Sequence, residues 1–300
     1  MPIYDASDFD EYIKNLDSIG FQSTQIARGA SILKDMISDK KARIFFSFTG
    51  NLIASGLRGA IAKIVEKGVV HAIITTAGAI DHDVIKSFIG YEIGSFYEND
   101  AALHKKGINR IGNILVKNDR YVKLEQICKD VFKNLNNKAN PTDIAKAFGQ
   151  YIDKNGKDKR KSFLYWAYKN NIPVFCPAIT DGAIGLQLYF FMQQKRDFDI
   201  AMRDDMNKLA NIVLNAEKTG ALIIGGGVSK HHVIGINIVR GGLDYAIYIT
   251  TATEFDGSLS GARSNEAISW GKLKDKAKHI DIHAEASLAL PLLLKKAGLF

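Results

Sequence analysis

Short runs of β-branched and aromatic residues alternate along this chain with longer stretches of helical periodicity. Residues 43–48 form the first apolar run and predict a buried strand. Apolar positions then recur at helical spacing over residues 51–67 and end at Gly68, a residue that favours the C-terminus of a helix. Further strands are predicted at residues 69–75, 111–116, 172–176, 221–224, 245–250 and 279–283, and further helices at residues 81–89, 200–217, 229–240 and 285–296.

This alternation is typical of an α/β fold, a doubly wound and mostly parallel sheet with crossover helices. No low-complexity linker or change in composition divides the chain. We therefore expect an irregular N-terminal arm over residues 1–40 and one catalytic domain over residues 41–300.

Four of the predicted strands end in loops of small and hydroxyl-bearing residues, at 75–78, 177–182, 225–227 and 250–253. Ligands of open parallel sheets bind beyond the carboxyl ends of the strands. One such loop is typical of a tight turn, whereas four together favour a nucleotide-type site.

The standard phosphate-binding and nucleophile motifs are absent. Gly225, Gly226 and Gly227 stand between a predicted strand and a predicted helix, but Lys230 occupies the third glycine position of a dinucleotide fingerprint. The sequence around Lys272 does not match the P-loop motif, and Ser229 lacks the flanking glycines of a nucleophile elbow. The sequence thus predicts a Rossmann-like NAD-binding fold without the standard fingerprint.

Residues 225–272 are unusually rich in polar side chains for loops that join buried strands. Within them Lys272 follows Trp270 and Gly271, an indole and a position that lets another group approach closely. A lysine that attacks a carbonyl or imine must be neutral, which costs roughly 4–5 kcal/mol at pH 7 from the ordinary pKa. Burial against the indole would offset part of this cost. His231, directly after the glycine turn, is a candidate for proton transfer.

His279 and His283 stand four residues apart but alternate with isoleucines, which predicts a strand. Their side chains would then lie about 13 Å apart, so a metal site is not expected there.

The composition narrows the remaining classes of function. Forty Lys and Arg against 32 Asp and Glu give a formal charge of +8. The densest basic run, residues 154–161, contains Asp158 and lacks interleaved aromatic residues, so it predicts a solvated loop rather than a nucleic-acid site. Cys128 and Cys176 cannot form a disulfide framework, which favours the cytoplasm, and no apolar run has the length of a membrane helix.

Seven blocks resemble the deoxyhypusine synthase family in order and spacing: residues 51–58, 75–78, 107–113, 177–182, 225–232, 254–263 and 269–272. The resemblance implies an NAD-dependent transferase. Such an enzyme moves the aminobutyl group of spermidine to a lysine of the hypusine-bearing translation factor. It also implies a homotetramer, a dimer of dimers with active sites at the interface within each pair.

Carried over by position, the resemblance implies Lys272 as the residue that forms the covalent imine intermediate and His231 as the proton-transfer group. The implied NAD ligands are Asn51, Thr76, Ala77, Gly78, Asp181, Gly226, Thr251, Ala252, Asp256, Glu285 and Ala286. The implied contacts of the amine substrate are Asp81, His82, Gly257, Ser258, Glu266 and Trp270.

Several positions depart from the family pattern. Leu186 and Leu259 stand where carboxylates are usual, and His82 stands where a glutamate is usual. Gly235 replaces an asparagine, and Gly50 and Ala54 replace serines. Losing carboxylates weakens the case for a tricationic donor, because each buried cation needs a partner. Asp81, Asp83, Asp256 and Glu266 are the candidates to compensate.

These departures leave three alternatives open. The chain is a deoxyhypusine synthase, a relative that uses another amine donor or a small-amine acceptor as homospermidine synthases do, or a catalytically silent NAD-binding relative. We expect Leu186 and Leu259 to line the amine channel.

Overall fold

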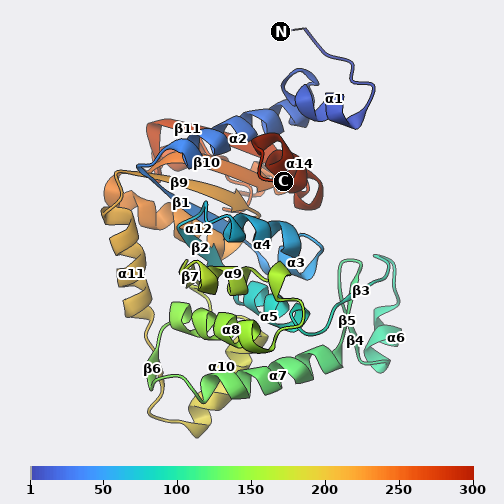
Figure 1. The fold of residues 1–300 in the computed structure, drawn as a ribbon, viewed down its shortest axis with the longest axis vertical. Coiled ribbons are helices and arrows are strands. Elements are labelled where there is room, and N and C mark those ends of the chain that lie inside the picture. Colours follow the sequence, from blue (N-terminus) through green and yellow to red (C-terminus); the bar gives the residue numbers. More distant parts are fainter. Residues whose placement is uncertain (1) are drawn as a thin grey trace. The chain divides into compact units, whose positions relative to one another are not determined.

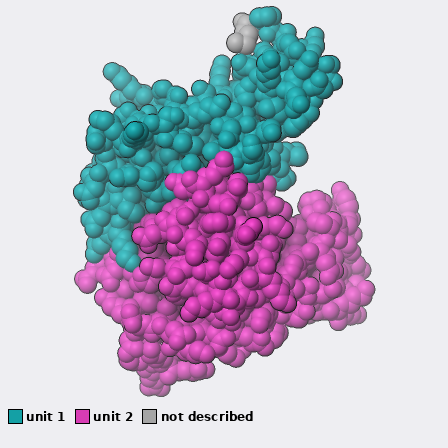
Figure 2. Space-filling view, viewed as in Figure 1, with its two compact units in different colours: residues 1–48, 69–74, 207–300 teal, residues 49–68, 75–206 magenta. Residues whose placement is uncertain are grey.

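The computed structural model describes residues 2–300, which fall into two compact units (Figure 2). Among these residues, unit 1 comprises 2–48, 69–74 and 207–300, and unit 2 comprises 49–68 and 75–206. Each unit is therefore built from segments that are distant in the sequence. The expected division into an arm over residues 1–40 and one domain over residues 41–300 stays a prediction.

A six-stranded sheet has the order β11-β10-β9-β1-β2-β7 (Figure 1). Its strands are β1 (Ala42–Phe48), β2 (Ala72–Thr75), β7 (Val174–Phe175), β9 (Lys218–Ile224), β10 (Leu243–Thr250) and β11 (Leu273–His283). The β1–β9, β9–β10 and β10–β11 pairs are parallel. Since β1, β9 and β10 are buried along nearly their whole length, they carry continuous apolar runs, as parallel strands covered on both faces do. The α/β prediction and these strand positions are confirmed.

The helices of unit 1 include α1 (Phe9–Lys14), α2 (Phe21–Ser38), α12 (Gly227–Ile236), α13 (Glu266–Ser269) and α14 (Ala286–Ala297), with one-turn helices η1 (Leu16–Ser18), η3 (Asn237–Arg240) and η4 (Glu254–Asp256). The expectation of an irregular N-terminal segment is wrong over α2. This helix buries Ile26, Ala30 and Leu33, and a Cβ at its Gly29 would lie 2.9 Å from Ile282 Cδ1. The N-terminal segment is thus part of the core of unit 1.

Unit 2 is mostly helical. Its helices are α3 (Gly50–Ala54), α4 (Arg58–Glu66), α5 (Ala77–Lys86), α6 (Asp100–Lys105), α7 (Asn118–Phe132), α8 (Pro141–Asn155), η2 (Lys159–Lys161), α9 (Phe163–Lys169) and α10 (Ala183–Gln194). Two further short strands, β6 (Lys138–Ala139) and β8 (Asp199–Ile200), pair in parallel and precede α11 (Met202–Leu214). The helix predicted over residues 51–67 is interrupted at residues 55–57.

The strand predicted at residues 111–116 is part of a separate sheet. Strands β3 (Glu92–Ile93), β4 (Ile108–Ile111) and β5 (Ile114–Lys117) form an antiparallel sheet in the order β3-β5-β4. Gly112, with φ +60°, makes the tight turn between β4 and β5. The assignment of this run to the parallel sheet was therefore wrong.

Three remaining sequence features have local explanations. Lys159 pairs with Asp153 at 3.1 Å and Lys161 with Asp158 at 3.7 Å, so part of the basic run is neutralised by neighbouring carboxylates. Cys128 and Cys176 are free, buried thiols whose pKa values are raised by burial. Within residues 2–300, no helix has the length and apolar character needed to cross a membrane.

Candidate active site

A cavity of about 240 Å³ in unit 1 collects most of the catalytic candidates. It is lined by Lys230, His231, Ile234, Tyr248, Gly257, Leu259, Ala262, Arg263, Glu266, Ala267, Trp270 and Lys272. The structure thus brings together the predicted lysine, histidine, glutamate and tryptophan, which come from α12, α13 and the turn between α13 and β11.

Lys272 is placed at the start of β11 by the turn that ends α13. Gly271 adopts φ +64°, and the Lys272 backbone N–H donates to the Ala267 carbonyl at 2.9 Å. The side chain is 8% exposed, and its Nζ lies 5.1 Å from the centroid of the Trp270 ring. Within residues 2–300 this Nζ donates to no side chain or carbonyl, so its amine is available to a reactant in the cavity.

His231 and His232 differ in their environments. His231 is exposed on the first turns of α12 and lines the cavity. His232 does not line it, and burial lowers the pKa of His232, with a smaller contribution from the charge of His231. Of the two histidines, His231 is the one that can exchange a proton with a group in the cavity.

The loop that covers one side of the cavity is anchored at several points in unit 1. Ser264 donates its backbone N–H to Asp281 Oδ1 at 2.9 Å and its hydroxyl to Asp281 Oδ2 at 2.5 Å, and its Oγ also lies 2.7 Å from His279 Nδ1. His279 is therefore a strand residue that holds this loop. A Cβ at Gly226 would lie 2.5 Å from Ser260 Oγ, so the glycine turn packs directly against the same loop.

Two lysines, rather than one, face the cavity. Lys230 is 1% exposed, and its Nζ donates to the Ala262 carbonyl at 2.7 Å and lies 4.5 Å from the centroid of the Tyr248 ring. Burial lowers the pKa of Lys230 to about 8, against the opposing charges of Asp281 and Glu266. Our reading of the sequence missed Lys230 and Tyr248 as residues of the site. The only signals were the position of Lys230 next to His231 and that of Tyr248 on a strand before a candidate loop.

The predicted NAD ligands of unit 1 lie in the loops that follow β9, β10 and β11. Gly226 is the N-cap residue of α12 and has no side chain to cap the helix. The Gly227 N–H donates to Ser260 Oγ at 3.1 Å, and the Cβ position of Gly227, at φ +65°, faces open space. The remaining predicted ligands of this unit follow β10 and β11; they are Thr251, Ala252, Asp256, Glu285 and Ala286. Uncapped N–H groups at a helix start after a parallel strand are suited to a phosphate group.

Two of these acidic ligands also make contacts within the chain. Glu285 Oε2 accepts the backbone N–H of Ser287 at 2.9 Å and so caps α14. Asp256 Oδ1 accepts the N–H of Ser258 at 2.7 Å, which lowers the pKa of that carboxyl. Both residues are exposed, so their carboxylate oxygens can still accept hydrogen bonds from a ligand.

In unit 2, the predicted ligands Asn51, Thr76, Ala77 and Gly78 come from α3 and the start of α5. Gly50 donates its N–H to Thr76 Oγ1 at 3.1 Å, and a Cβ at residue 50 would lie 2.8 Å from the carbonyl carbon of Gly78. The two helix starts are thus in direct backbone contact. Helix α5 also begins without a side-chain cap, which leaves its first N–H groups available.

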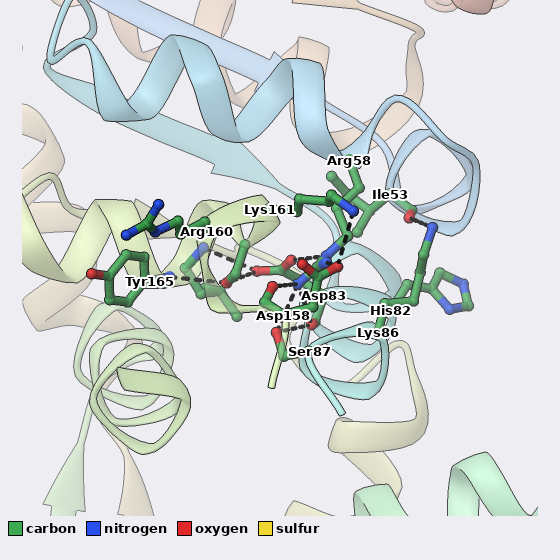
Figure 3. A network of polar contacts seen from close by, with 12 residues as sticks. Ile53, Arg58, His82, Asp83, Lys86, Ser87, Asp158, Arg160, Lys161 and Tyr165 are labelled. Atoms are coloured by element: carbon green, nitrogen blue, oxygen red, sulfur yellow. Dashed lines mark hydrogen bonds and ion pairs between the residues drawn. The ribbon is translucent and has the colours of Figure 1, made fainter. Parts of the chain in front are cut away.

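A polar network fixes α3 and α5 to each other (Figure 3). Lys86, in the last turn of α5, donates to the carbonyls of Ile53, Ala54 and Ser55 at 2.6–3.0 Å, which satisfies the C-terminal end of α3. This contact explains why the predicted helix over residues 51–67 divides where it does. Burial lowers the pKa of Lys86 to about 8.

Asp83, proposed from the sequence as a compensating carboxylate, has partners on both of its carboxylate oxygens within this network. It pairs with Arg58 Nε at 2.7 Å and accepts the hydroxyl of Ser162 at 2.7 Å and the N–H of Leu164 at 3.0 Å. Arg58 and Asp83 are 3% and 0% exposed, which makes this a buried, saturated ion pair. Asp83 is therefore a structural residue.

Asp81, a residue of α5, contacts the start of α10. Its two carboxylate oxygens accept the backbone N–H groups of Ala183 and Ile184 at 2.9 and 2.8 Å. Burial raises the pKa of Asp81 to about 6 despite these hydrogen bonds. Contact with the amine substrate stays a prediction for this residue.

His82, at the position of a usual glutamate, is 8% exposed. Its Nδ1 lies 2.8 Å from the Tyr91 hydroxyl, and burial, helped by the charge of Lys86, lowers the pKa of His82 to about 4. A neutral imidazole cannot replace a carboxylate as the partner of a cation. His82 can offer only a neutral hydrogen bond.

The two leucines at usually acidic positions have different surroundings. Leu259 lines the cavity that holds Lys272, and that this cavity is the amine channel stays a prediction. Leu186 is 53% exposed on α10 in unit 2, and Asp181 lies in the exposed loop before that helix. The cavity of unit 1 therefore has one carboxylate on its lining, Glu266. The ligands from unit 1 and those from unit 2 each form a group within their own unit.

Comparison with known proteins identifies one family. The family model for deoxyhypusine synthase matches residues 11–297. A Thermococcus kodakarensis protein named as a probable deoxyhypusine synthase is 43% identical, covering 97% of this chain and 91% of its own length. One from Methanocaldococcus jannaschii is 42% identical, with 92% and 88% covered. The crystal structure of an Entamoeba histolytica protein assigned to the same enzyme has a TM-score of 0.70 at 24% identity, covering 99% of this chain and 96% of that one.

Proposed function

Since this chain belongs to the deoxyhypusine synthase family of transferases, we propose that it moves the aminobutyl group of spermidine to a specific lysine of the hypusine-bearing translation factor. The observation that carries the proposal is the cavity of unit 1. It combines an available lysine, Lys272, with a histidine, a carboxylate and an indole. These are the side chains needed to bind an amine donor, to form a covalent imine with it after its oxidation, and to transfer the aminobutyl group.

The capture step follows from the properties of Lys272. Once the donor has been oxidised to an imine, the neutral Lys272 amine adds to the imine carbon. The C–N bond between that carbon and the donor nitrogen then breaks, and that nitrogen takes up a proton and leaves as part of a diamine. The lysine of the protein substrate displaces Lys272 from the new imine in the same way. His231 lines the same cavity and is placed to take and return the protons of these exchanges.

Glu266 and Trp270 would hold the donor in the cavity. Glu266 is the carboxylate of the lining and can form a charge-assisted hydrogen bond with an ammonium group of the donor. The Trp270 ring faces the Lys272 Nζ, and its face suits the cationic and methylene parts of a polyamine.

Each unit holds residues that suit NAD. The start of α5 lacks a side-chain cap, and small residues form the turns before α5 and α12. In unit 1 the proposed NAD ligands are Thr251, Ala252, Glu285 and Ala286, and in unit 2 they are Asn51, Gly78 and Asp181. When bound, NAD supplies the acceptor for the oxidation of the donor and the reductant for the final imine.

The proposal is tested by trapping the imine on Lys272. The protein is incubated with spermidine and NAD, reduced with borohydride, and measured by intact mass and peptide mapping. We expect one aminobutyl adduct on Lys272 that requires NAD and is lost in Lys272→Ala. The exposed Lys276 of the same unit provides the matched control, since Lys276→Ala should keep the adduct. A wild-type protein without an adduct would support the catalytically silent alternative.

A second candidate function uses a different amine donor or passes the group to a small-amine acceptor. Leu259 on the cavity wall favours it, because a lining with one carboxylate offers few partners for a tricationic donor. An adduct on Lys272 that passes to putrescine, and not to the translation factor, would establish this alternative.

We also propose a homotetramer. Its support is the exposed apolar stripe on α10, formed by Leu186, Tyr189 and Phe190, which are 53%, 51% and 48% exposed. These residues stand at i, i+3 and i+4 and share one helix face. A second copy of the chain is the occupant that the family implies for such a face.

A further inference from the structure

Helix α3, which carries the proposed NAD ligand Asn51, is too short to be stable without its neighbours. It has five residues, Gly50–Ala54, and isolated helices shorter than about 12 residues are marginal in water. Its N-terminus has no side-chain cap, and the chain leaves it at Ser55 in extended backbone. The place of Asn51 must therefore be fixed by contacts with neighbouring elements.

Helix α5 supplies such contacts at both ends of α3. At the N-terminal end, Thr76 Oγ1, just before α5, accepts the Gly50 N–H at 3.1 Å. At the C-terminal end, Lys86 Nζ, in the last turn of α5, donates to the carbonyls of residues 53–55 at 3.0, 2.8 and 2.6 Å. Asn51 lies between these two attachments.

The Lys86 ammonium group is fully committed to α3. An ammonium has three donors, and all three are used by consecutive backbone carbonyls. The half-buried side chain points toward the backbone of Ile53 and away from the Arg58–Asp83 pair (Figure 3). No carboxylate of residues 2–300 forms an ion pair with it. Since withdrawing a cation from water without a carboxylate partner is costly, this placement calls for an explanation.

The short length of α3 transmits a hold on its last turn to Asn51. Five residues span about 7.5 Å along a helix axis, so a shift at one end moves the whole element. The Asn51 amide is also tied to the chain before α3, because its Oδ1 accepts the Thr49 hydroxyl at 2.5 Å. Without Lys86, the last carbonyls of α3 would have to find water, and the helix would fray.

We propose that Lys86 is a positioning residue of the cofactor ligands in unit 2, whose ammonium group holds the end of α3 and so keeps Asn51 in place beside the start of α5. The inference rests on the proposed function and adds to it a residue that acts through α3. Lys86 should therefore govern the affinity for NAD and leave the chemistry at Lys272 unchanged once NAD is bound.

The charge of Lys86 gives the inference a pH dependence. Burial lowers the pKa of Lys86 to about 8, with a smaller contribution from the charge of Arg58. Below pH 8 the ammonium group keeps its three donors, and above pH 8 it loses its charge and one donor. The affinity for NAD should therefore fall as pH rises from 7 to 9.5. The other titratable groups that face Lys86 are His82, Tyr91, Asp83, Asp158 and Lys161.

The first test is Lys86→Met, which keeps an unbranched apolar stem and removes the ammonium group. Titration with NAD at pH 7 should give a dissociation constant about tenfold higher, as expected when the competent arrangement is populated about a tenth of the time. At saturating NAD, with spermidine and a borohydride quench, adduct formation on Lys272 should reach the wild-type rate. Between pH 7 and 9.5 the wild-type affinity should fall towards that of Lys86→Met, whose own affinity should not change.

Lys86→Arg is the conservative variant. A guanidinium keeps its charge and its donors at every pH of the experiment. This variant should bind NAD more tightly than Lys86→Met and should lose the fall in affinity towards pH 9.5.

Lys63 in α4 offers the matched control. It is also a lysine of the last turn of a helix in unit 2, but its Nζ pairs with Glu66 at 2.7 Å. Lys63→Met should leave both the affinity for NAD and its pH response at the wild-type values.

The outcomes separate the inference from the proposed function. If wild-type protein binds NAD but forms no adduct, aminobutyl transfer fails, and the titrations with NAD still decide the role of Lys86. Wild-type affinity in Lys86→Met would exclude that role. A rate at saturating NAD that falls together with the affinity would mark Lys86 as a residue of general stability. A wild-type pH response that persists in Lys86→Met would assign the titration to another group and overturn the inference.

Discussion

His82 shows how burial changes the chemistry of one position. Its ordinary pKa is 6.5, and burial lowers the pKa in the folded chain to about 4. The unfolded chain therefore binds a proton first as pH falls, so the stability that neutral His82 contributes is present above pH 6.5 and is lost towards pH 4.

We therefore expect the free energy of unfolding to contain a His82 contribution that falls by about 2 kcal/mol between pH 7 and pH 5. Urea denaturation of wild type and His82→Gln at both pH values measures it as the difference between the two pH responses. The exposed His104, also in unit 2, is the control, because His104→Gln should respond to pH as the wild type does. An identical pH response in His82→Gln would show that His82 is protonated as readily in the folded chain as in the unfolded one.

At the residue scale, the sequence predicted those site residues that belong to a recognisable motif. Lys272, His231, Glu266 and Trp270 were predicted and lie on one cavity. Tyr248 could not be found in this way, because its place on the cavity wall is a property of the folded chain. Asp83 looked like a free carboxylate in the sequence, and only the structure reveals its pairing with Arg58.

At the scale of elements, the contact between α3 and α5 positions the cofactor ligands proposed in unit 2. A Cβ at Gly50 would lie 2.8 Å from the carbonyl carbon of Gly78 and 3.0 Å from the Ala79 nitrogen. Both neighbours are backbone atoms that cannot turn aside as a side chain would. There is a physical reason, then, for the glycine at a position where the family usually has serine.

Gly50→Ala should push α3 away from the start of α5. We expect the free energy of unfolding to fall by about 1–3 kcal/mol and NAD to bind more weakly. Urea denaturation and titration with NAD measure the two effects. Gly59→Ala in α4 is the matched control, because its Cβ would meet only Lys161 Cγ at 4.0 Å, and it should be neutral or stabilising. Wild-type NAD affinity in Gly50→Ala would remove α3 from the cofactor site.

Element positions could be predicted better than their boundaries or partners. The buried strands β1, β9 and β10 follow from their continuous apolar runs. The break between α3 and α4 depends on Lys86, which lies more than thirty residues away in the sequence from the carbonyls of Ile53 and Ala54. Helix α2 was missed although Ile26, Ala30 and Leu33 recur at helical spacing.

At the scale of the whole molecule, the formal charge of +8 says little about recognition. The proposed substrates are a polyamine and an exposed lysine, which are themselves cationic. Recognition would depend on a few local groups such as Glu266, while the exposed basic run is partly paired with Asp153 and Asp158.

The apolar stripe on α10 leads to a prediction about assembly. Replacing Tyr189 and Phe190 together by glutamate should convert the proposed tetramer into a smaller species, because charges at a buried apolar interface are unfavourable. Light scattering coupled to size-exclusion chromatography measures the mass. Val239, also exposed but in unit 1, is the control, and Val239→Glu should leave the mass unchanged. A double variant with the mass of a tetramer would place the interface elsewhere.

The central claim is aminobutyl transfer to a protein lysine. The most direct measurement is the intact mass of the purified translation factor after incubation with this protein, spermidine and NAD. We predict a gain of one aminobutyl group on a single lysine, which requires NAD and is lost with Lys272→Ala. An unchanged mass of the translation factor, under conditions in which Lys272 itself becomes modified, would contradict the claim.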